Sequence, residues 1–123
     1  MSERDFVSRF NRWAKYCLGH SAAVELKLAK TKTLPLSALK PHQAANLRHA
    51  KTGTLVWKIP DVGIALKPFD CFVLCRVRAY VAVMFYKRNQ KTFYLIDVDI
   101  FLSETKGLTE ERAREIGQEC FLA

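Results

Sequence analysis

Hydrophobic and polar residues alternate along the chain with two different periods, and the change of period separates helices from strands. Apolar residues spaced three or four apart over 3–18 predict an amphipathic helix. Strict alternation over 22–30 predicts a half-buried strand, with its apolar residues on one face and Glu25 and Lys27 on the other. The chain therefore begins with a helix followed by a strand.

The rest of the chain reads as a second helix, several strands and a last helix. Pro41 suits a first helical position and Gly53 follows the expected end, so we expect a helix over 41–51. The apolar runs that predict strands are 54–59, 69–75, 79–86 and 92–96, with a loop over 60–68. Thr109 begins a final acidic helix at about 108–120. This order predicts one α/β (α+β) domain, residues 1–123, with a mixed central sheet flanked by helices.

Length and composition fit that single domain. The chain has 123 residues, of which 50% are hydrophobic and 26% charged. The run 79–86 is too short to span a bilayer, and the charged N-terminus lacks a secretory signal, so we expect a cytoplasmic protein with no membrane partner. The cysteines lack zinc-site spacing, and we expect them to be small core residues. They are Cys17, Cys71, Cys75 and Cys120.

Charge is distributed unevenly. Positions 1–96 hold 17 Lys and Arg against 5 Asp and Glu, whereas 97–123 hold 3 against 7, which gives the net charge of +8. Such a balance favours a polyanionic partner, nucleic acid before a membrane surface, although a basic protein without such a partner also fits. A phosphate-binding surface should avoid carboxylates that serve no purpose, so the acids of the basic part are candidates for chemistry. They are Glu3, Asp5, Glu25, Asp61 and Asp70.

Glu25 and Lys27 form the most specific local pattern, because side chains two apart on a strand share a face. A carboxylate is a hard ligand for Mg²⁺ or Mn²⁺, and an ammonium can orient water or stabilise charge on phosphate. The same pattern also fits an ordinary exposed strand face. Asp70 is the best candidate for a second metal-binding carboxylate. Its alternative role is that of a turn residue that accepts hydrogen bonds from nearby backbone N–H groups. Turn and helix-dipole roles are the simpler explanations for Asp61 and Glu3.

Polar and basic residues of the second helix complete the candidate set. His42 and Gln43 lie in its first turn, where they can face phosphates or form part of a solvated surface. The residues that we expect to contact nucleic acid are Lys30, Lys32, Lys40, His42, Arg48, Lys58 and Lys67.

Several of these motifs together resemble the PD-(D/E)XK nucleases, and among them the Holliday junction resolvases of the RecU-like and archaeal type. The resemblance includes the sequence AVELK at 23–27, LPL at 34–36 and the His-Gln pair in the helix that follows. The apolar runs after it look like the hairpin of those proteins, and Glu3 on a first helix also fits. The similarity covers about 3–102 of the chain.

The resemblance implies a restriction-endonuclease-like fold and a structure-selective endonuclease that acts on four-way DNA junctions as a homodimer. It implies Mg²⁺ or Mn²⁺ as the cofactor, with Lys27 positioning the attacking water and Gln43 orienting water or phosphate. The implied metal ligands are Asp70, Glu25, Glu3 and Asp61. The expected setting is the cytoplasm of a bacterial, archaeal or phage-infected cell.

The order of the motifs departs from the family pattern. In those nucleases a hairpin with the catalytic aspartate precedes the E-x-K strand, but here 19–22 alone separate the first helix from that strand. We therefore expect a circularly permuted variant, in which the later hairpin docks beside this strand and brings Asp70 to Glu25 and Lys27. Two alternatives to a junction resolvase remain. One is another repair or restriction-like nuclease of the same chemistry, and the other is a non-catalytic basic module that binds nucleic acid.

Overall fold

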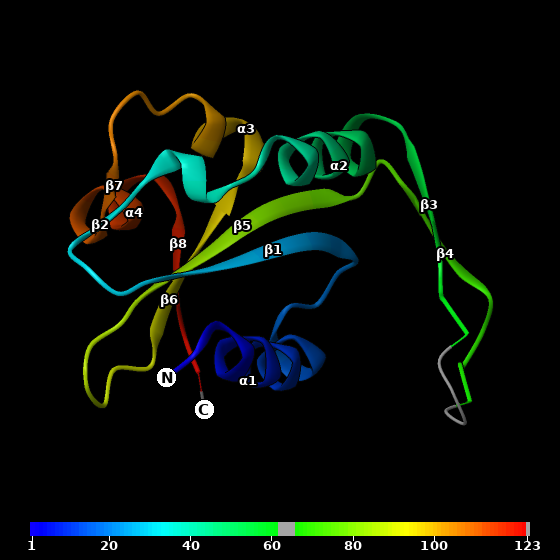
Figure 1. The fold of residues 1–123 in the computed structure, drawn as a ribbon, viewed down its shortest axis with the longest axis horizontal. Helices are drawn as coiled ribbons and strands as arrows, with labels where there is room; N and C mark the ends of the chain where they lie inside the picture. The colour runs from blue at the N-terminus through cyan, green and yellow to red at the C-terminus, as the bar shows by residue number, and fades with distance from the viewer. Residues whose placement is uncertain (62–65, 123) are drawn as a thin grey trace.

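The fold is a four-stranded sheet between helices, seen in a computed structural model that describes residues 1–61 and 66–122 (Figure 1). The strand order is β1-β5-β6-β8, with β1 parallel to β5 and the other neighbours antiparallel. The strands are β1 (Ala22–Ala29), β5 (Arg78–Phe85), β6 (Thr92–Asp97) and β8 (Gln118–Phe121). The expected α/β class, a mixed central sheet flanked by helices, is confirmed.

Helix α1 (Glu3–Cys17) covers one face of this sheet (Figure 1). Ser2 and Asp5 form a capping box, which satisfies backbone donors at the start of the helix and fixes where it begins. Phe6 and Phe10 then point into the sheet, where both rings make edge contacts with Phe93. The expected first helix is confirmed.

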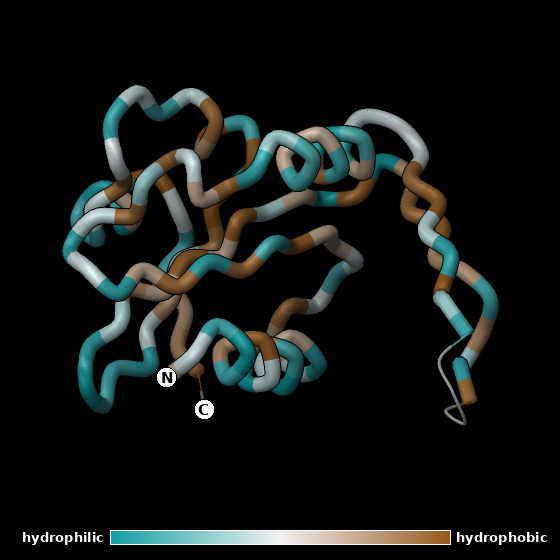
Figure 2. Tube along the Cα trace, viewed as in Figure 1, coloured by the Kyte–Doolittle hydropathy of each residue, from teal (hydrophilic) through white to brown (hydrophobic). Residues whose placement is uncertain are grey.

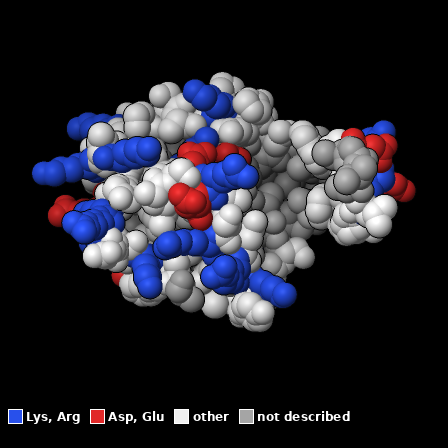
Figure 3. Space-filling view, turned by 60° about the horizontal axis from the view of Figure 1, so that its bottom comes forward, with Lys and Arg blue, Asp and Glu red and all other residues white. Residues whose placement is uncertain are grey.

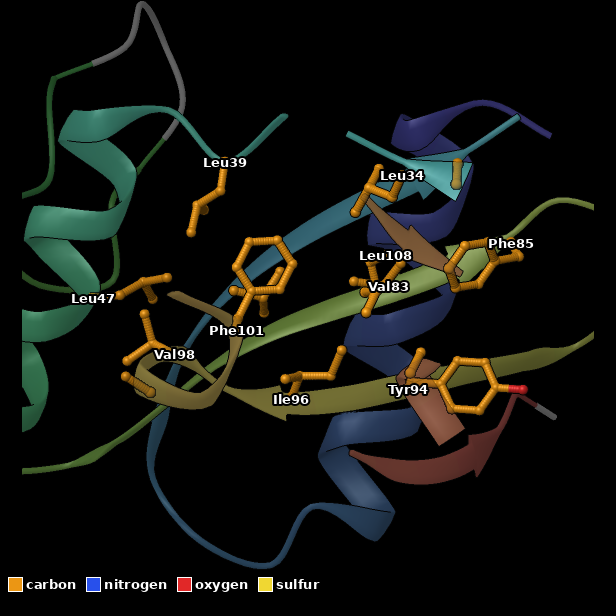
Figure 4. Packing of buried hydrophobic residues seen from close by; sticks show 14 residues of the cluster. Leu34, Leu39, Leu47, Val83, Phe85, Tyr94, Ile96, Val98, Phe101 and Leu108 are labelled. Atoms are coloured by element: carbon orange, nitrogen blue, oxygen red, sulfur yellow. The ribbon is translucent and has the colours of Figure 1, made fainter. Parts of the chain in front are cut away.

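The opposite face is covered by α2 (Pro41–Thr52), α3 (Val98–Leu102) and α4 (Glu110–Ile116), with the 3₁₀ turn η1 (Leu36–Ala38) and the small sheet of β2 (Thr33–Leu34) and β7 (Leu108–Thr109). Figure 4 shows the core on this side, where Val83 and Ile96 of the sheet face the surrounding helices. Successive residues of β5 point alternately into the hydrophobic cores on the two faces of the sheet, which explains why its whole run is apolar.

The alternation expected along β1 is also confirmed. Val24, Leu26 and Leu28 pack with α1 on one side of the sheet. Glu25 and Lys27 point to the α2 side, because successive strand residues face opposite ways. The first helix therefore lies across the sheet from the E-x-K pair.

Strands β3 (Thr54–Lys58) and β4 (Cys71–Cys75) form a separate hairpin that projects beyond the end of α2 (Figure 1). Its base is fixed, because Arg76 N donates to Gly53 O at 2.9 Å and Val77 N donates to Ala50 O at 3.0 Å. Figure 2 shows hydrophobic residues along the projecting strands. Part of the loop expected over 60–68, positions 62–65, lies outside the described residues.

Three expectations about local structure are wrong. The acidic helix is shorter than 108–120, since α4 ends at Ile116 and β8 follows. Gly117 marks the change, because a Cβ there would lie 2.8 Å from the carbonyl oxygen of Leu95. Of the cysteines, Cys120 is buried, but the others are exposed because they lie on the hairpin or at the end of α1: Cys17, Cys71 and Cys75. The hairpin does not dock beside β1, whose sheet neighbour is β5.

In the described part of the chain, no helix combines the length and apolar character needed to cross a membrane.

Candidate functional site

Glu25 and Lys27 form a close pair on β1. Glu25 Oε1 lies 3.4 Å from Lys27 Nζ, and the lysine side chain is only 11% exposed against 30% for the glutamate. Within the described residues Lys27 is the single charged residue that is buried. Removing an ammonium from water is costly unless a partner compensates it, and Glu25 is that partner.

Gln43 joins α2 to this pair. Its Nε2 donates to Glu25 Oε1 at 3.0 Å, and its Oε1 accepts from the backbone N of Lys40 at 3.0 Å. The amide therefore both caps the helix start and fixes one carboxylate oxygen of Glu25. Sequence reasoning placed Glu25, Lys27 and Gln43 in one site, and the fold brings these three side chains together.

A small surface pocket opens beside this cluster, between β1 and the first turns of α2. The polar residues on its wall provide a carboxylate, two amides and an imidazole. The lining residues are Ala23, Val24, Glu25, His42, Gln43, Asn46, Leu47 and Leu55.

Asp70 lies away from this pocket. It directly precedes β4, five strand steps from Cys75 at the hairpin base, which corresponds to ~17 Å of strand. Its side chain is 90% exposed and pairs with Lys67 at 3.3 Å. The expected docking of Asp70 beside Glu25 in the same chain is therefore not found, because the fixed base of the hairpin directs its tip outward.

The other two expected metal ligands are also remote from Glu25. Glu3 is exposed on α1, across the sheet from the cluster. Asp61 pairs with Lys67 at 2.7 Å at the far end of the hairpin. No group of three or more His, Cys, Asp or Glu residues suited to a metal occurs among the described residues. One chain thus supplies a single carboxylate at the cluster, which does not fit a firmly held Mg²⁺.

The expected nucleic-acid contacts fall into two groups. Arg48 pairs with Asp99 at 3.2 Å and Lys67 with two aspartates, so acids partly neutralise both charges. The others are exposed, and His42 lies on the pocket wall beside Glu25. These exposed residues are Lys30, Lys32, Lys40, His42 and Lys58.

A basic groove that sequence reasoning missed runs between α1 and the β5–β6 turn. The sequence signals of this groove were the helical spacing of Arg9 and Arg12 and the basic run KRNQK at 87–91. No local pattern indicates that these two segments meet in the fold. Figure 3, which brings the α1 side forward, shows Lys and Arg side chains gathered on this part of the body. The basic residues of the groove are Arg9, Arg12, Lys87, Arg88 and Lys91, with Asp5 beside them.

A second polar cluster lies under the same turn. Glu110 accepts from Lys87 at 2.8 Å and from Tyr94 Oη at 2.9 Å. Burial opposes ionisation of Glu110, but these hydrogen bonds and one from Gln90 outweigh it, so its pKa is lowered. Burial and the bond to Glu110 raise the pKa of Tyr94 to about 12. These groups hold the turn, and they also line two surface pockets beside it.

Comparisons of the chain with protein-family models, with curated proteins and with solved structures found no match. Function is therefore inferred from the cluster on β1, the basic groove and the sequence resemblance.

Proposed function

We propose that the protein is a structure-selective DNA endonuclease that hydrolyses phosphodiester bonds, with four-way junctions as its main substrate. The observation that carries the proposal is the buried Lys27 paired with Glu25, whose carboxylate is held by Gln43 and lines an open pocket together with it. A buried ammonium lowers stability relative to an apolar side chain, and such groups concentrate at functional sites.

The three side chains have separate roles in this proposal. Lys27 provides a positive charge, which stabilises the charge that develops on the phosphate oxygens as water attacks phosphorus and the sugar oxygen leaves. Glu25 would supply one carboxylate ligand to a divalent cation. Gln43 keeps the carboxylate in one orientation, because its Nε2 donates to Glu25 Oε1.

Mg²⁺ or Mn²⁺ is the proposed cofactor. The cluster of one chain offers Glu25 as its one carboxylate within the described residues, so the ligand set must be completed from elsewhere. A homodimer is proposed for this reason as well as for the two strands that a junction presents for cutting.

DNA binding is assigned to phosphate contacts rather than base readout. The groove between α1 and the β5–β6 turn, on the α1 side of the sheet and thus across it from Glu25 and Lys27, holds five basic side chains, and the chain carries a net charge of +8. Phosphate contacts read the shape and path of the backbone without sequence information, which suits a branched substrate. The cytoplasm of a bacterial, archaeal or phage-infected cell is the proposed place of action.

Cleavage assays on labelled four-way junction, duplex and single strand, with Mg²⁺ or with EDTA, test the proposal. We expect paired, symmetric nicks on the junction with Mg²⁺, loss of them in Lys27→Met, and their retention in Lys106→Met. Cutting of plain duplex by the wild type would indicate a less selective nuclease of the same chemistry. Tight binding by the wild type without any metal-dependent product would overturn catalysis and leave a basic binding module.

A further inference from the structure

One of the two surface pockets beside the β5–β6 turn adjoins the basic groove. We call it the Lys30 pocket, because its wall includes Lys30 and Lys32, which follow β1, together with Thr109 at the start of α4. The basic groove lies on the α1 side of the sheet, whereas this pocket lies toward α4. Tyr86 and Lys87 line both of them. The groove and the pocket therefore meet at these two residues, around the end of the sheet.

Tyr86 has a fixed backbone and an open side chain at this meeting point. Its backbone N donates to the carbonyl oxygen of Ala29 at 2.7 Å, which ties the residue to the end of β1. Tyr86 is 43% exposed, whereas the neighbouring Phe85 is only 2% exposed. An aromatic ring on a fixed backbone that stays open to solvent offers a face on which another flat ring can stack.

Basic side chains lie on both sides of this ring. The groove holds five of them, and the Lys30 pocket adds the exposed Lys30 and Lys32, which makes seven against three acids. Two of the acids are already engaged, since Asp5 is part of the capping box of α1 and Glu110 accepts hydrogen bonds from three side chains. Glu111, the third acid, is exposed. The surface as a whole therefore attracts a polyanion.

A stacking ring between two groups of cations fits a single-stranded polynucleotide. The bases of a duplex stack on one another, whereas those of a single strand are free to stack on an aromatic side chain while Lys and Arg follow the phosphates. The groove and the pocket have volumes of about 770 and 520 Å³, within the ~300–1,000 Å³ that is typical of ligand sites. A lipid surface fits less well, because peripheral membrane binding needs a projecting apolar face and Tyr86 lines the walls of two hollows.

We propose that the basic groove and the Lys30 pocket together bind a single-stranded polynucleotide, with one unpaired base stacked on Tyr86. The groove holds the phosphates on one side of this base, and Lys30 and Lys32 hold those on the other. Every base has a face for stacking, so the contact selects unpaired bases without selecting a sequence.

The binding surface rests on the groove, the pocket and Tyr86 alone, whereas its use in cleavage rests on the proposed function. Lys30 follows Lys27 by three residues, or ~10 Å of extended chain. A strand that passes Tyr86 from the groove to Lys30 therefore moves from the α1 side of the sheet toward the side that holds Glu25 and Lys27.

Fluorescence anisotropy in EDTA tests binding without cleavage. The probes are labelled oligothymidylate and oligouridylate of about 12 nucleotides, a duplex of the same length, and an abasic oligonucleotide with the same number of phosphates. We expect at least one of the two single strands to bind the wild type more tightly than the duplex does, and the comparison between them shows whether DNA or RNA is preferred.

Two substitutions at Tyr86 isolate the stacking contact. Tyr86→Ala should bind the preferred single strand about tenfold more weakly than the wild type, and Tyr86→Phe should bind it as the wild type does, because the phenylalanine ring keeps the stacking face. The abasic oligonucleotide should bind the wild type and Tyr86→Ala equally, since it offers no base to stack. Trp57→Ala removes an exposed aromatic ring from the remote hairpin and is the matched control, which should bind like the wild type.

Lys30 and Lys32 are tested by salt. Lys30→Ala and Lys32→Ala should each reduce the slope of log Kd against log salt by about 0.7 on the single strand, which corresponds to one lost phosphate contact. Slopes equal to that of the wild type in both variants would remove the Lys30 pocket from the binding surface.

Three results overturn the proposal as a whole. They are equal affinity of the wild type and Tyr86→Ala for the single strands, an equal loss of Tyr86→Ala on the abasic chain, and binding of the wild type to phosphatidylserine vesicles but to no oligonucleotide. Photo-cross-linking of the wild type to an oligonucleotide that contains 5-iododeoxyuridine needs no variant, and the cross-link should lie on the peptide that contains Tyr86. Cross-links confined to other peptides contradict the stacking contact.

Failure of this inference and failure of the nuclease proposal give different results. A wild type that cuts junctions but binds single strands no better than duplex contradicts the single-strand surface and leaves the nuclease proposal standing. A wild type that binds single strands through Tyr86 but cuts no DNA contradicts the nuclease proposal alone.

Discussion

Lys27 is held at 11% exposure by a strand that could have placed an apolar residue in the same position. Buried ion pairs often return only part of the free energy that removal from water costs. Lys27 is thus a residue of the kind that concentrates at sites with a chemical role.

Replacing Lys27 by Met separates these two effects. The substitution keeps the length of the side chain and removes its charge, so we expect the free energy of unfolding to stay the same or rise by about 1 kcal/mol. Cleavage should fall about 100-fold or more, because a positive charge that stabilises the transition state is lost. Thermal denaturation and single-turnover assays measure the two effects. Lys106→Met, exposed in the loop after α3, is the control, and full activity in Lys27→Met would refute the role.

A pH dependence follows from Lys51, which contacts Asp97 at 2.8 Å and Asp99 at 2.7 Å. The hydrogen bond from Lys51 lowers the pKa of Asp99 below its ordinary 3.8. The unfolded chain thus takes up a proton more readily, so this stabilisation is present above pH 3.8 and is lost as the pH falls through the lower pKa of the folded state.

Urea unfolding of Asp99→Asn tests that sign. Between pH 6 and pH 3 the wild type should lose more unfolding free energy than this variant, with the difference concentrated toward the acid end. The unfolding free energy of Asp61→Asn, on the exposed hairpin, should change with pH over the same range as that of the wild type does. If the unfolding free energies of the wild type and Asp99→Asn fall in parallel with pH, Asp99 contributes nothing to the pH dependence of stability.

At the scale of elements, Glu110 ties the first turn of α4 to the β5–β6 turn and to Tyr94. Glu110→Ala should lower the unfolding free energy by about 2 kcal/mol, since it leaves the hydroxyl of the buried Tyr94 without its acceptor. Glu111→Ala is the matched control, an exposed acid in the same turn, and should change stability by less than about 0.5 kcal/mol. Chemical denaturation measures the unfolding free energy of both variants. Equal losses in Glu110→Ala and Glu111→Ala would contradict the structural role of Glu110.

The elements with a strong local pattern were predictable from sequence. The alternation of β1 and the spacing of apolar residues in α1 define those elements without reference to the rest of the chain. Strand β8 was missed because four residues after a helix carry little pattern, and its pairing with β6 is a tertiary contact. Helix α3 was missed for a similar reason, since it depends on Asp97 acting as its cap.

At the scale of the molecule, the candidate site was predicted in part. Glu25 and Lys27 share a face by strand geometry, and Gln43 followed from the resemblance. Asp70 and Glu3 were placed with them by analogy, but the direction of a hairpin and the face that a helix covers depend on packing between distant segments. The basic groove was missed for the same physical reason.

Salt dependence tests that groove as a phosphate-binding surface. Arg12→Ala and Lys91→Ala should each weaken junction binding, and each should reduce the slope of log Kd against log salt by about one, because one phosphate contact is lost. Fluorescence anisotropy over a salt series measures the slope. Lys106→Ala, exposed in the loop after α3, should leave it unchanged. Slopes equal to the wild type in all variants would place DNA elsewhere.

The parallel register of β1 and β5 also orders events during synthesis. Ala22 pairs with Arg78 and Ala29 with Phe85, so β1 has no sheet neighbour until the ribosome has passed β5. Glu25 and Lys27 are translated early, yet they acquire their folded surroundings only after most of the chain has emerged. Under the proposed function, a nascent chain thus carries the pair in an unassembled form that cannot yet cleave DNA.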